Sequence, residues 1–183
     1  MLSELEKVIA ALKYWGLKPD PRIYAWRFFI QKTAFLLKAL GVSINYDDFT
    51  IYIKGPYSRE LNCDYIDHWV KINELSTSYV PSKRDIEIFE KIRSIAFRGI
   101  AERDDIIAQQ QLQECISTAI FVKQAYPEFD DDEVFAKVKF HKPYLSDSMI
   151  VVGITRAKEL LFKPEFLTEE IRNEIDEWNR IDD

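Results

Sequence analysis

Glycine, proline, cysteine and histidine are all scarce in this chain of 183 residues. Five glycines and seven prolines argue against collagen-like repeats, against disorder and against a loop-rich all-β fold. Two cysteines are too few for a scaffold held together by disulfides. No run approaches the roughly 18 apolar residues of a membrane span, and the acidic N-terminus lacks the pattern of a signal peptide. We therefore expect a cytoplasmic protein without membrane association, whose thiols are reduced.

The motifs of common catalytic and phosphate-binding sites are also absent from the sequence. It contains no GxGxxG, no P-loop pattern, no GxSxG and no HExxH. Its two cysteines and two histidines (Cys63, Cys115, His68 and His141) do not have the short ligand spacing of structural zinc modules. We expect both cysteines to fill the core as small apolar residues, and we expect no metal, no cofactor and no catalytic residue. An enzyme with scattered catalytic groups stays open as a minor alternative.

Charge of one sign predominates, because 31 acidic residues face 25 Lys and Arg, for a formal net charge of −6. This balance disfavours general nucleic-acid binding, which depends on cations that neutralise phosphates, although it allows a local basic surface. Apolar residues make up 47% of the chain. A chain of this length and composition predicts one domain over residues 1–183, which buries roughly 70% of its unfolded surface.

Apolar residues recur at intervals of three and four along most of the sequence, which predicts helices. Ser3 with Glu6 and Ser82 with Asp85 have the spacing of capping boxes, and Asp20, followed by proline, is typical of a helix start. The predicted helices lie at 3–15, 23–40, 61–75, 88–96, 105–120, 134–138, 147–162 and 169–180.

One segment changes period, since apolar and polar residues alternate over 49–54 and predict a half-buried strand. Gly55 and Pro56 would end that strand in a turn, and Ser58 would cap the next helix. A second short strand is predicted at 76–80, paired with the first. The expected fold class is therefore mainly α, a compact single-domain multi-helix fold with a small two-stranded β-ribbon.

The ribbon turn is the first candidate functional site, because it combines two tyrosines, a lysine and a rigid corner. Tyrosine offers a large contact area at a low entropic cost and is enriched at protein interfaces. The same residues also suit a plain strand-to-helix corner that needs glycine and proline for its geometry, and both interpretations can hold together. The candidate partner-binding residues are Tyr52, Lys54, Gly55, Pro56, Tyr57 and Ser58.

A second candidate is the basic cluster of Lys137, Lys139, His141 and Lys142. Such a cluster is typical of a solvated helix face. It would also suit a docking surface for an acidic partner or for nucleic acid. The sequence leaves both alternatives open.

Three segments carry a family resemblance. QKTAFLL at 31–37 and FTIYIKGPYSREL at 49–61, followed by the segment 112–142, resemble the YwgA-type proteins and the SocA-like, or Panacea, antitoxin domain. The similarity covers roughly residues 25–162, and its most specific part is GPYS at 55–58. The matching positions are Gln31, Lys32, Tyr52, Gly55, Pro56, Tyr57, Ser58 and Leu61.

The resemblance implies a helical domain with a small β-ribbon that works as an antitoxin or proteolytic adaptor by binding a protein toxin. No catalytic residue carries over. The chain departs from the pattern by its additional helices at 3–15 and 169–180, which could form a dimer seam. We therefore expect a protein-binding module, antitoxin-like or adaptor-like, whose partner is a toxin-like protein or an assembly subunit. The alternative is a nucleic-acid-binding regulator with a winged-helix-like arrangement of helix and ribbon.

Overall fold

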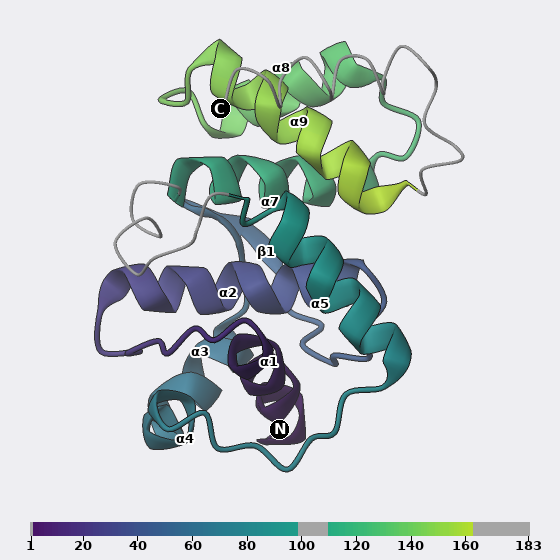
Figure 1. Ribbon diagram of the computed structural model, residues 1–183. Helices are drawn as coiled ribbons and strands as arrows, with labels where there is room; N and C mark the ends of the chain where they lie inside the picture. Colours follow the sequence, from purple (N-terminus) through teal and green to yellow (C-terminus); the bar gives the residue numbers. More distant parts are fainter. Residues whose placement is uncertain (1, 99–109, 163–183) are drawn as a thin grey trace.

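Helices make up most of the computed structural model, which describes residues 2–98 and 110–162 (Figure 1). One short antiparallel hairpin accompanies them, so the expected fold class, mainly α with a small two-stranded ribbon, is confirmed. The helices are α1 (Leu2–Tyr14), α2 (Tyr24–Ala39), α3 (Arg59–Asp67), α4 (Trp69–Asn73), α5 (Lys83–Ile95), α7 (Gln110–Ala125), α8 (Asp131–His141) and α9 (Asp147–Leu161), and the strands are β1 (Thr50–Tyr52) and β2 (Gly55–Tyr57).

The helices are stacked, with α2 near the middle of the molecule. Figure 1 shows α1 below α2, then α7 above it and the pair α8 and α9 on top, while α5 runs along one side. α2 is buried on nearly all its faces, as the apolar residues on more than one of its faces predict. Its aromatic residues pack edge to face or tilted against neighbouring rings, for example Phe29 against Trp26 and Phe97. The core is thus built around this one helix.

Only the C-terminal end of α2 agrees with the sequence prediction. Gly41 has a φ of +99° just after the helix, as expected of a glycine at its C-terminal end. The predicted N-cap at Asp20 is wrong, because α2 begins at Tyr24 and its N-cap is Ile23. The Asp20 carboxylate instead accepts hydrogen bonds from the backbone and side chain of Arg22, which closes a separate turn before the helix.

α7 and α9 lie in close contact because Gly153 leaves room for Cys115. A Cβ on Gly153 would lie 2.4 Å from the Cys115 sulfur. Cys115 is fully buried, and burial raises the pKa of its thiol to about 12. Its predicted core-filling role is therefore confirmed, whereas the same prediction for Cys63 is wrong, because that side chain is exposed on α3.

The ribbon forms within a single short segment. β1 pairs with β2 in the register Thr50 with Tyr57 and Tyr52 with Gly55, so the loop has only two residues. Gly55 has a φ of +86°, a conformation that glycine adopts without strain. The predicted pairing of 49–54 with a strand at 76–80 is wrong, because the tight turn lets β1 pair locally at a small loop-closure cost.

Of the two predicted capping boxes, one is present in the structure. The Ser82 hydroxyl accepts from the backbone N–H of Asp85, and the Asp85 carboxylate accepts from the backbone N–H of Ser82, so the capping box is confirmed. The box predicted for Ser3 and Glu6 is wrong, because α1 already begins at Leu2. The helix predicted over 61–75 is divided at His68 into α3 and α4.

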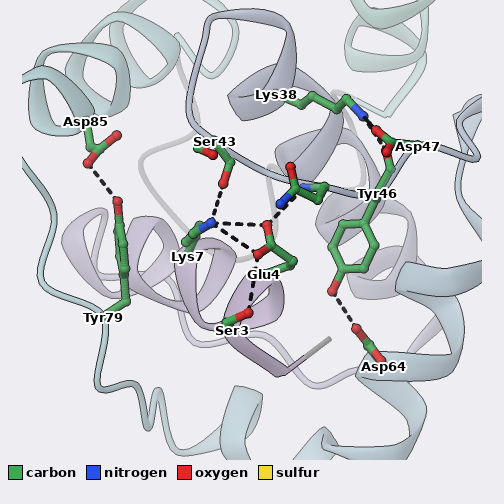
Figure 2. A network of polar contacts seen from close by, with 11 residues as sticks. Ser3, Glu4, Lys7, Lys38, Ser43, Tyr46, Asp47, Asp64, Tyr79 and Asp85 are labelled. Atoms are coloured by element: carbon green, nitrogen blue, oxygen red, sulfur yellow. Dashed lines mark hydrogen bonds and ion pairs between the residues drawn. The ribbon is translucent and has the colours of Figure 1, made fainter.

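The N-terminus of α1 is held by a polar network that Figure 2 shows from close by. The Glu4 carboxylate accepts from the Lys7 ammonium at 3.1 Å and from the backbone N–H of Asn45 at 2.8 Å. Lys7 also donates to the carbonyl of Ser43. We call Glu4, Lys7, Ser43 and Asn45 the α1 network, and it ties the first helix to the chain that follows α2.

Two of the predicted features lie outside the described residues: the helix start near 105 with the break at Gly99, and the C-terminal helix at 169–180. Among the residues that are described, no helix is both long and apolar enough to cross a membrane. The same residues contain no group of three or more His, Cys, Asp or Glu side chains placed to hold a metal ion.

Candidate functional site

The hairpin is held from below by two buried ammonium groups. Lys142, just after α8, donates to the carbonyl oxygens of Tyr52 at 2.7 Å and of Ile53 at 2.5 Å. Lys32, on α2, donates to the carbonyl oxygen of Pro56 at 2.7 Å. The two lysines are only 1–2% exposed. The backbone of the turn is therefore fixed from two sides by side chains that are distant in the sequence.

Glu114 of α7 provides the negative charge that these lysines need. Its carboxylate is 3.4 Å from the Lys142 ammonium and 3.8 Å from that of Lys54, and its side chain is 1% exposed. The Tyr144 hydroxyl donates to the same carboxylate. Buried charges persist in proteins when they are paired and hydrogen-bonded. We call Lys32, Glu114 and Lys142 the buried charge cluster.

Burial changes the protonation of the cluster. It lowers the pKa of Lys32 to about 7, while the nearby Glu114 charge opposes that shift and the Lys142 charge adds to it. The pKa of Lys142 is also below its ordinary value because of burial, again opposed by Glu114. One carboxylate therefore faces an excess of lysines, and burial makes the proton of Lys32 easier to lose than that of an ordinary lysine.

The far end of the hairpin is fixed by Ser58 and Gln31. The Ser58 hydroxyl accepts from the backbone N–H of Leu61 at 3.0 Å and caps α3, as predicted. The Gln31 amide accepts from the Ser58 N–H at 2.9 Å and donates to the Ser58 carbonyl at 2.8 Å. The Asp48 carboxylate accepts from the Ser58 hydroxyl and from the backbone N–H of Arg59. Neighbouring residues of α2, Gln31 and Lys32, thus hold the middle of β2 and the residue that follows it.

Gly55 is required at its position for a second reason besides its φ. A Cβ there would lie 3.0 Å from the Thr118 hydroxyl and 3.3 Å from the Lys32 ammonium. The hairpin therefore lies directly against α2 and α7, and a larger residue would push it away from the buried charge cluster.

A cleft of about 230 Å³ opens beside the hairpin. α2 and α3 form its other walls. It is lined by Tyr24, Arg27, Phe28, Gln31, Lys32, Tyr52, Ile53, Lys54, Gly55, Tyr57, Asn62 and Tyr65. Large apolar side chains at its rim are open to solvent: Tyr52 is 60% exposed, Ile53 is 66% exposed and Tyr24 is 59% exposed. We call Tyr24, Tyr52, Ile53, Lys54 and Tyr57 the hairpin face.

The structure divides the six predicted partner-binding residues into two groups. Tyr52, Lys54 and Tyr57 line the cleft, and of these Tyr52 is exposed while Lys54 and Tyr57 are partly buried. Gly55, Pro56 and Ser58 are buried and shape the backbone. The segment therefore contains both side chains that reach the cleft and residues that shape the backbone of the corner.

The predicted basic cluster does not form one surface. Lys142 is buried and is directed at the hairpin, so its assignment to a surface patch is wrong. Lys139 is ion-paired with Asp147 at 2.8 Å. Partial burial, together with the charges of Lys137 and Lys142, lowers the pKa of His141 and favours its neutral form. Lys137 is partly buried, and its ammonium lies 5.4 Å from the centre of the Tyr126 ring. The four residues therefore do not present a set of free cations of the kind that binds phosphates.

A larger cavity of about 510 Å³ lies between α7, α8 and α9, but its charged groups are engaged within the chain. Lys158 is ion-paired with Asp131, and Lys123 donates to the carbonyl oxygens of Pro127 and Phe129. Its wall also reaches Phe162, the last described residue, so the cleft beside the hairpin is the better-described candidate site.

The key residues that sequence reasoning missed are Lys32, Glu114 and Lys142 acting together. Lys32 gave one signal, because it is a charged residue in the middle of a helix that is apolar on more than one face. Glu114 gave only a weaker signal, next to the buried Cys115. Comparisons of the chain with models of protein families, with curated proteins and with solved structures found no match.

Proposed function

We propose that this protein is a protein-binding module, of the antitoxin or adaptor kind, that holds a partner protein against its hairpin face. The observation that carries the proposal is the exposure of Tyr52 and Ile53 on a turn whose carbonyl groups are fixed by the buried charge cluster. Exposed apolar side chains cost solubility, and a contiguous set of them marks interaction sites.

The chemistry of the hairpin face suits a protein partner. Tyrosine and arginine are the residues that most often dominate binding energy at protein interfaces, and the cleft contains four tyrosines and Arg27. A turn that is already rigid loses little conformational entropy when it binds. The face therefore combines suitable side chains with a scaffold that does not need to rearrange.

The sequence resemblance agrees with this proposal. The segment 55–58, which resembles the GPYS part of the SocA-like antitoxin domain, forms one edge of the hairpin face. The partner would then be a toxin-like protein or an assembly subunit, met in the cytoplasm. A nucleic-acid-binding role has less support, because Lys142 is buried and Lys139 is ion-paired.

The test is capture of the partner from an extract of the native source, with the full chain as bait at moderate and high salt. The double variant Tyr52→Ala/Ile53→Ala would lose the partner, because it removes the apolar centre of the hairpin face. The matched control is Phe140→Ala, which removes an aromatic side chain that is 77% exposed on α8, outside the cleft.

The proposal would be supported by one near-stoichiometric protein that the wild type and the Phe140→Ala variant retain at high salt and the double variant loses. Equal capture by all three baits would contradict it. An eluate rich in nucleic acid that disappears at high salt would favour the nucleic-acid alternative instead.

A further inference from the structure

The charge of the cleft beside the hairpin is opposite in sign to the charge of the whole chain. The formal net charge of the protein is −6, yet the residues lining the cleft include Arg27, Lys32 and Lys54 and no aspartate or glutamate. The nearby Glu114 lies beneath the hairpin, where Lys142 and Tyr144 already occupy its carboxylate. An anionic group would therefore meet attraction at this cleft and repulsion over much of the remaining surface.

Arg27 provides the strongest feature for recognition of an anion. Its Nε is buried and has no hydrogen-bond partner among the described residues. Its guanidinium carbon lies 5.9 Å from the centre of the Tyr24 ring, and both residues line the cleft. A buried donor without a partner is costly, and a carboxylate is the group that matches a guanidinium in shape and charge.

Lys54 provides a second cation on the opposite side of the cleft. Its side chain is 44% exposed, and its ammonium lies 4.4 Å from the centre of the Tyr144 ring. Its distance to the Glu114 carboxylate is 3.8 Å, which is longer than a direct hydrogen bond. Lys54 is thus a cleft-lining cation with only a long ion pair to Glu114, and its half-exposed ammonium can also meet an anion from solvent.

The walls between these cations are mostly aromatic. The side chains that form them are Tyr24, Phe28, Tyr52, Tyr57 and Tyr65, together with Ile53. The volume of about 230 Å³ is below the range of roughly 300–1,000 Å³ that is usual for sites of small-molecule ligands. A space of this size suits one anchoring side chain of a peptide, with the flanking residues outside.

We propose that the cleft binds an acidic segment of the partner protein, in which an aromatic side chain enters between the tyrosines and the carboxylates on either side of it pair with Arg27 and Lys54. This inference rests on the proposed function, because it names the part of the partner that the hairpin face recognises.

The test uses four short peptides with blocked ends and the full-length, isotope-labelled protein. The central residues are Glu-Phe-Glu, Gln-Phe-Gln, Lys-Phe-Lys and Glu-Ala-Glu, in the same glycine and serine flanks. NMR titration at low salt should show binding of the first peptide, with shifts at residues 24–28 and 52–57. Each of the other three should bind about tenfold more weakly or worse, since each lacks the charge or the ring.

Two variants locate the binding site. Arg27→Gln should weaken the Glu-Phe-Glu peptide about tenfold, whereas Arg84→Gln, which changes an exposed arginine of α5, should leave its affinity unchanged. If Arg27→Gln fails to fold, Lys54→Gln removes the other cation of the cleft at a half-exposed position and should also weaken binding of the Glu-Phe-Glu peptide.

Equal affinity for the Gln-Phe-Gln peptide, preference for the Lys-Phe-Lys peptide, or no binding of any peptide would overturn the inference. Its failure is distinguishable from failure of the proposed function. If no peptide binds while capture of the partner still depends on Tyr52 and Ile53, the acidic segment is wrong and the protein-binding role stands. If the Glu-Phe-Glu peptide binds while capture is independent of those residues, the proposed role of the hairpin face is wrong.

Discussion

Two clusters in this protein use the same pair of residue types, glutamate and lysine, in different surroundings. In the α1 network the Glu4 side chain is 8% exposed and that of Lys7 is 15% exposed, and the carboxylate also accepts a backbone N–H. In the buried charge cluster Glu114 and Lys142 are each 1% exposed. The α1 network has one ammonium for its one carboxylate, whereas the buried cluster surrounds one carboxylate with more than one lysine.

The difference shows what each arrangement does for the fold. A partly open pair loses little hydration and contributes modestly to stability. A sealed group of charges has lost its water, so each member depends on the others. The buried cluster donates to three carbonyl groups of the hairpin, which makes the position of the hairpin face depend on residues that never reach the surface.

The largest effect is expected for Glu114→Gln, which leaves the buried lysines without their carboxylate. Breaking a buried ion pair typically costs about 3–5 kcal/mol, and we expect a loss of free energy of unfolding in that range. Urea denaturation near neutral pH measures it. A loss below about 1 kcal/mol, the scale of an ordinary hydrogen bond, would mean that the cluster is not dependent on this charge.

The next effect is a dependence of stability on pH that comes from Lys32. Its pKa in the folded chain is about 7, and that of an unfolded lysine is about 10.4. Between these values the unfolded state binds more protons, so the free energy of unfolding rises with pH by up to about 1.4 kcal/mol per unit.

Lys32→Met should remove much of this rise between about pH 7 and 9, when urea denaturation is repeated at several pH values. Lys142 adds a slope of the same sign, since its pKa is also lowered by burial, so some dependence should remain in the variant. Parallel curves for the wild type and the variant would show that Lys32 keeps its proton in the folded protein.

A smaller effect, whose pH dependence lies in the acid range, is expected in the α1 network. Glu4→Gln should cost about 1 kcal/mol at neutral pH, because a charged acceptor becomes neutral. Burial alone would raise the pKa of Glu4, but the Asn45 N–H and the Lys7 ammonium hold it below its ordinary value. The stabilisation is therefore present above the unfolded pKa of about 4.3 and is lost as the pH falls through the lower folded pKa.

Acid titration of both proteins checks this prediction. The difference in free energy of unfolding between the wild type and Glu4→Gln should shrink towards zero in strong acid. A constant difference across that range would assign the effect to packing and not to charge.

The smallest effect on stability is expected for Tyr52→Ala, at less than about 0.5 kcal/mol, because the side chain is mostly exposed. Thermal unfolding of this variant beside Glu114→Gln would separate the two roles in one segment. A loss comparable to that of Glu114→Gln would mean that the tyrosine belongs to the fold, and it would remove the basis for a binding face.

The sequence predicted the parts of the site that are local. The cap at Ser58 was found because its chemistry acts within a few residues. The turn predicted at Gly55 and Pro56 is displaced, because the turn residues are Ile53 and Lys54, and Gly55 and Pro56 belong to β2. The pairing of the ribbon was not found, since the segment 76–80 was also predicted to be a short strand. A one-dimensional pattern indicates which residues suit a strand, and it does not indicate which partner the turn geometry brings within hydrogen-bond reach.

Lys142 shows most clearly what the sequence could not indicate. Its neighbours Lys137 and Lys139 made it look like part of a basic surface. α8 ends at His141, and the chain then brings Lys142 under the carbonyl groups of Tyr52 and Ile53, about 90 residues earlier in the sequence.

The sequence by itself determined the helical class, the central buried helix, the corner at 55–58 and the tyrosines beside it, because each of these depends on periodicity or on a local backbone preference. Only the tertiary structure decided which charges are buried together, which strand pairs with β1 and where the cleft opens. Those outcomes depend on contacts between α2, α7 and the end of α8, and the cost of burying a charge is settled only when its partners are in place.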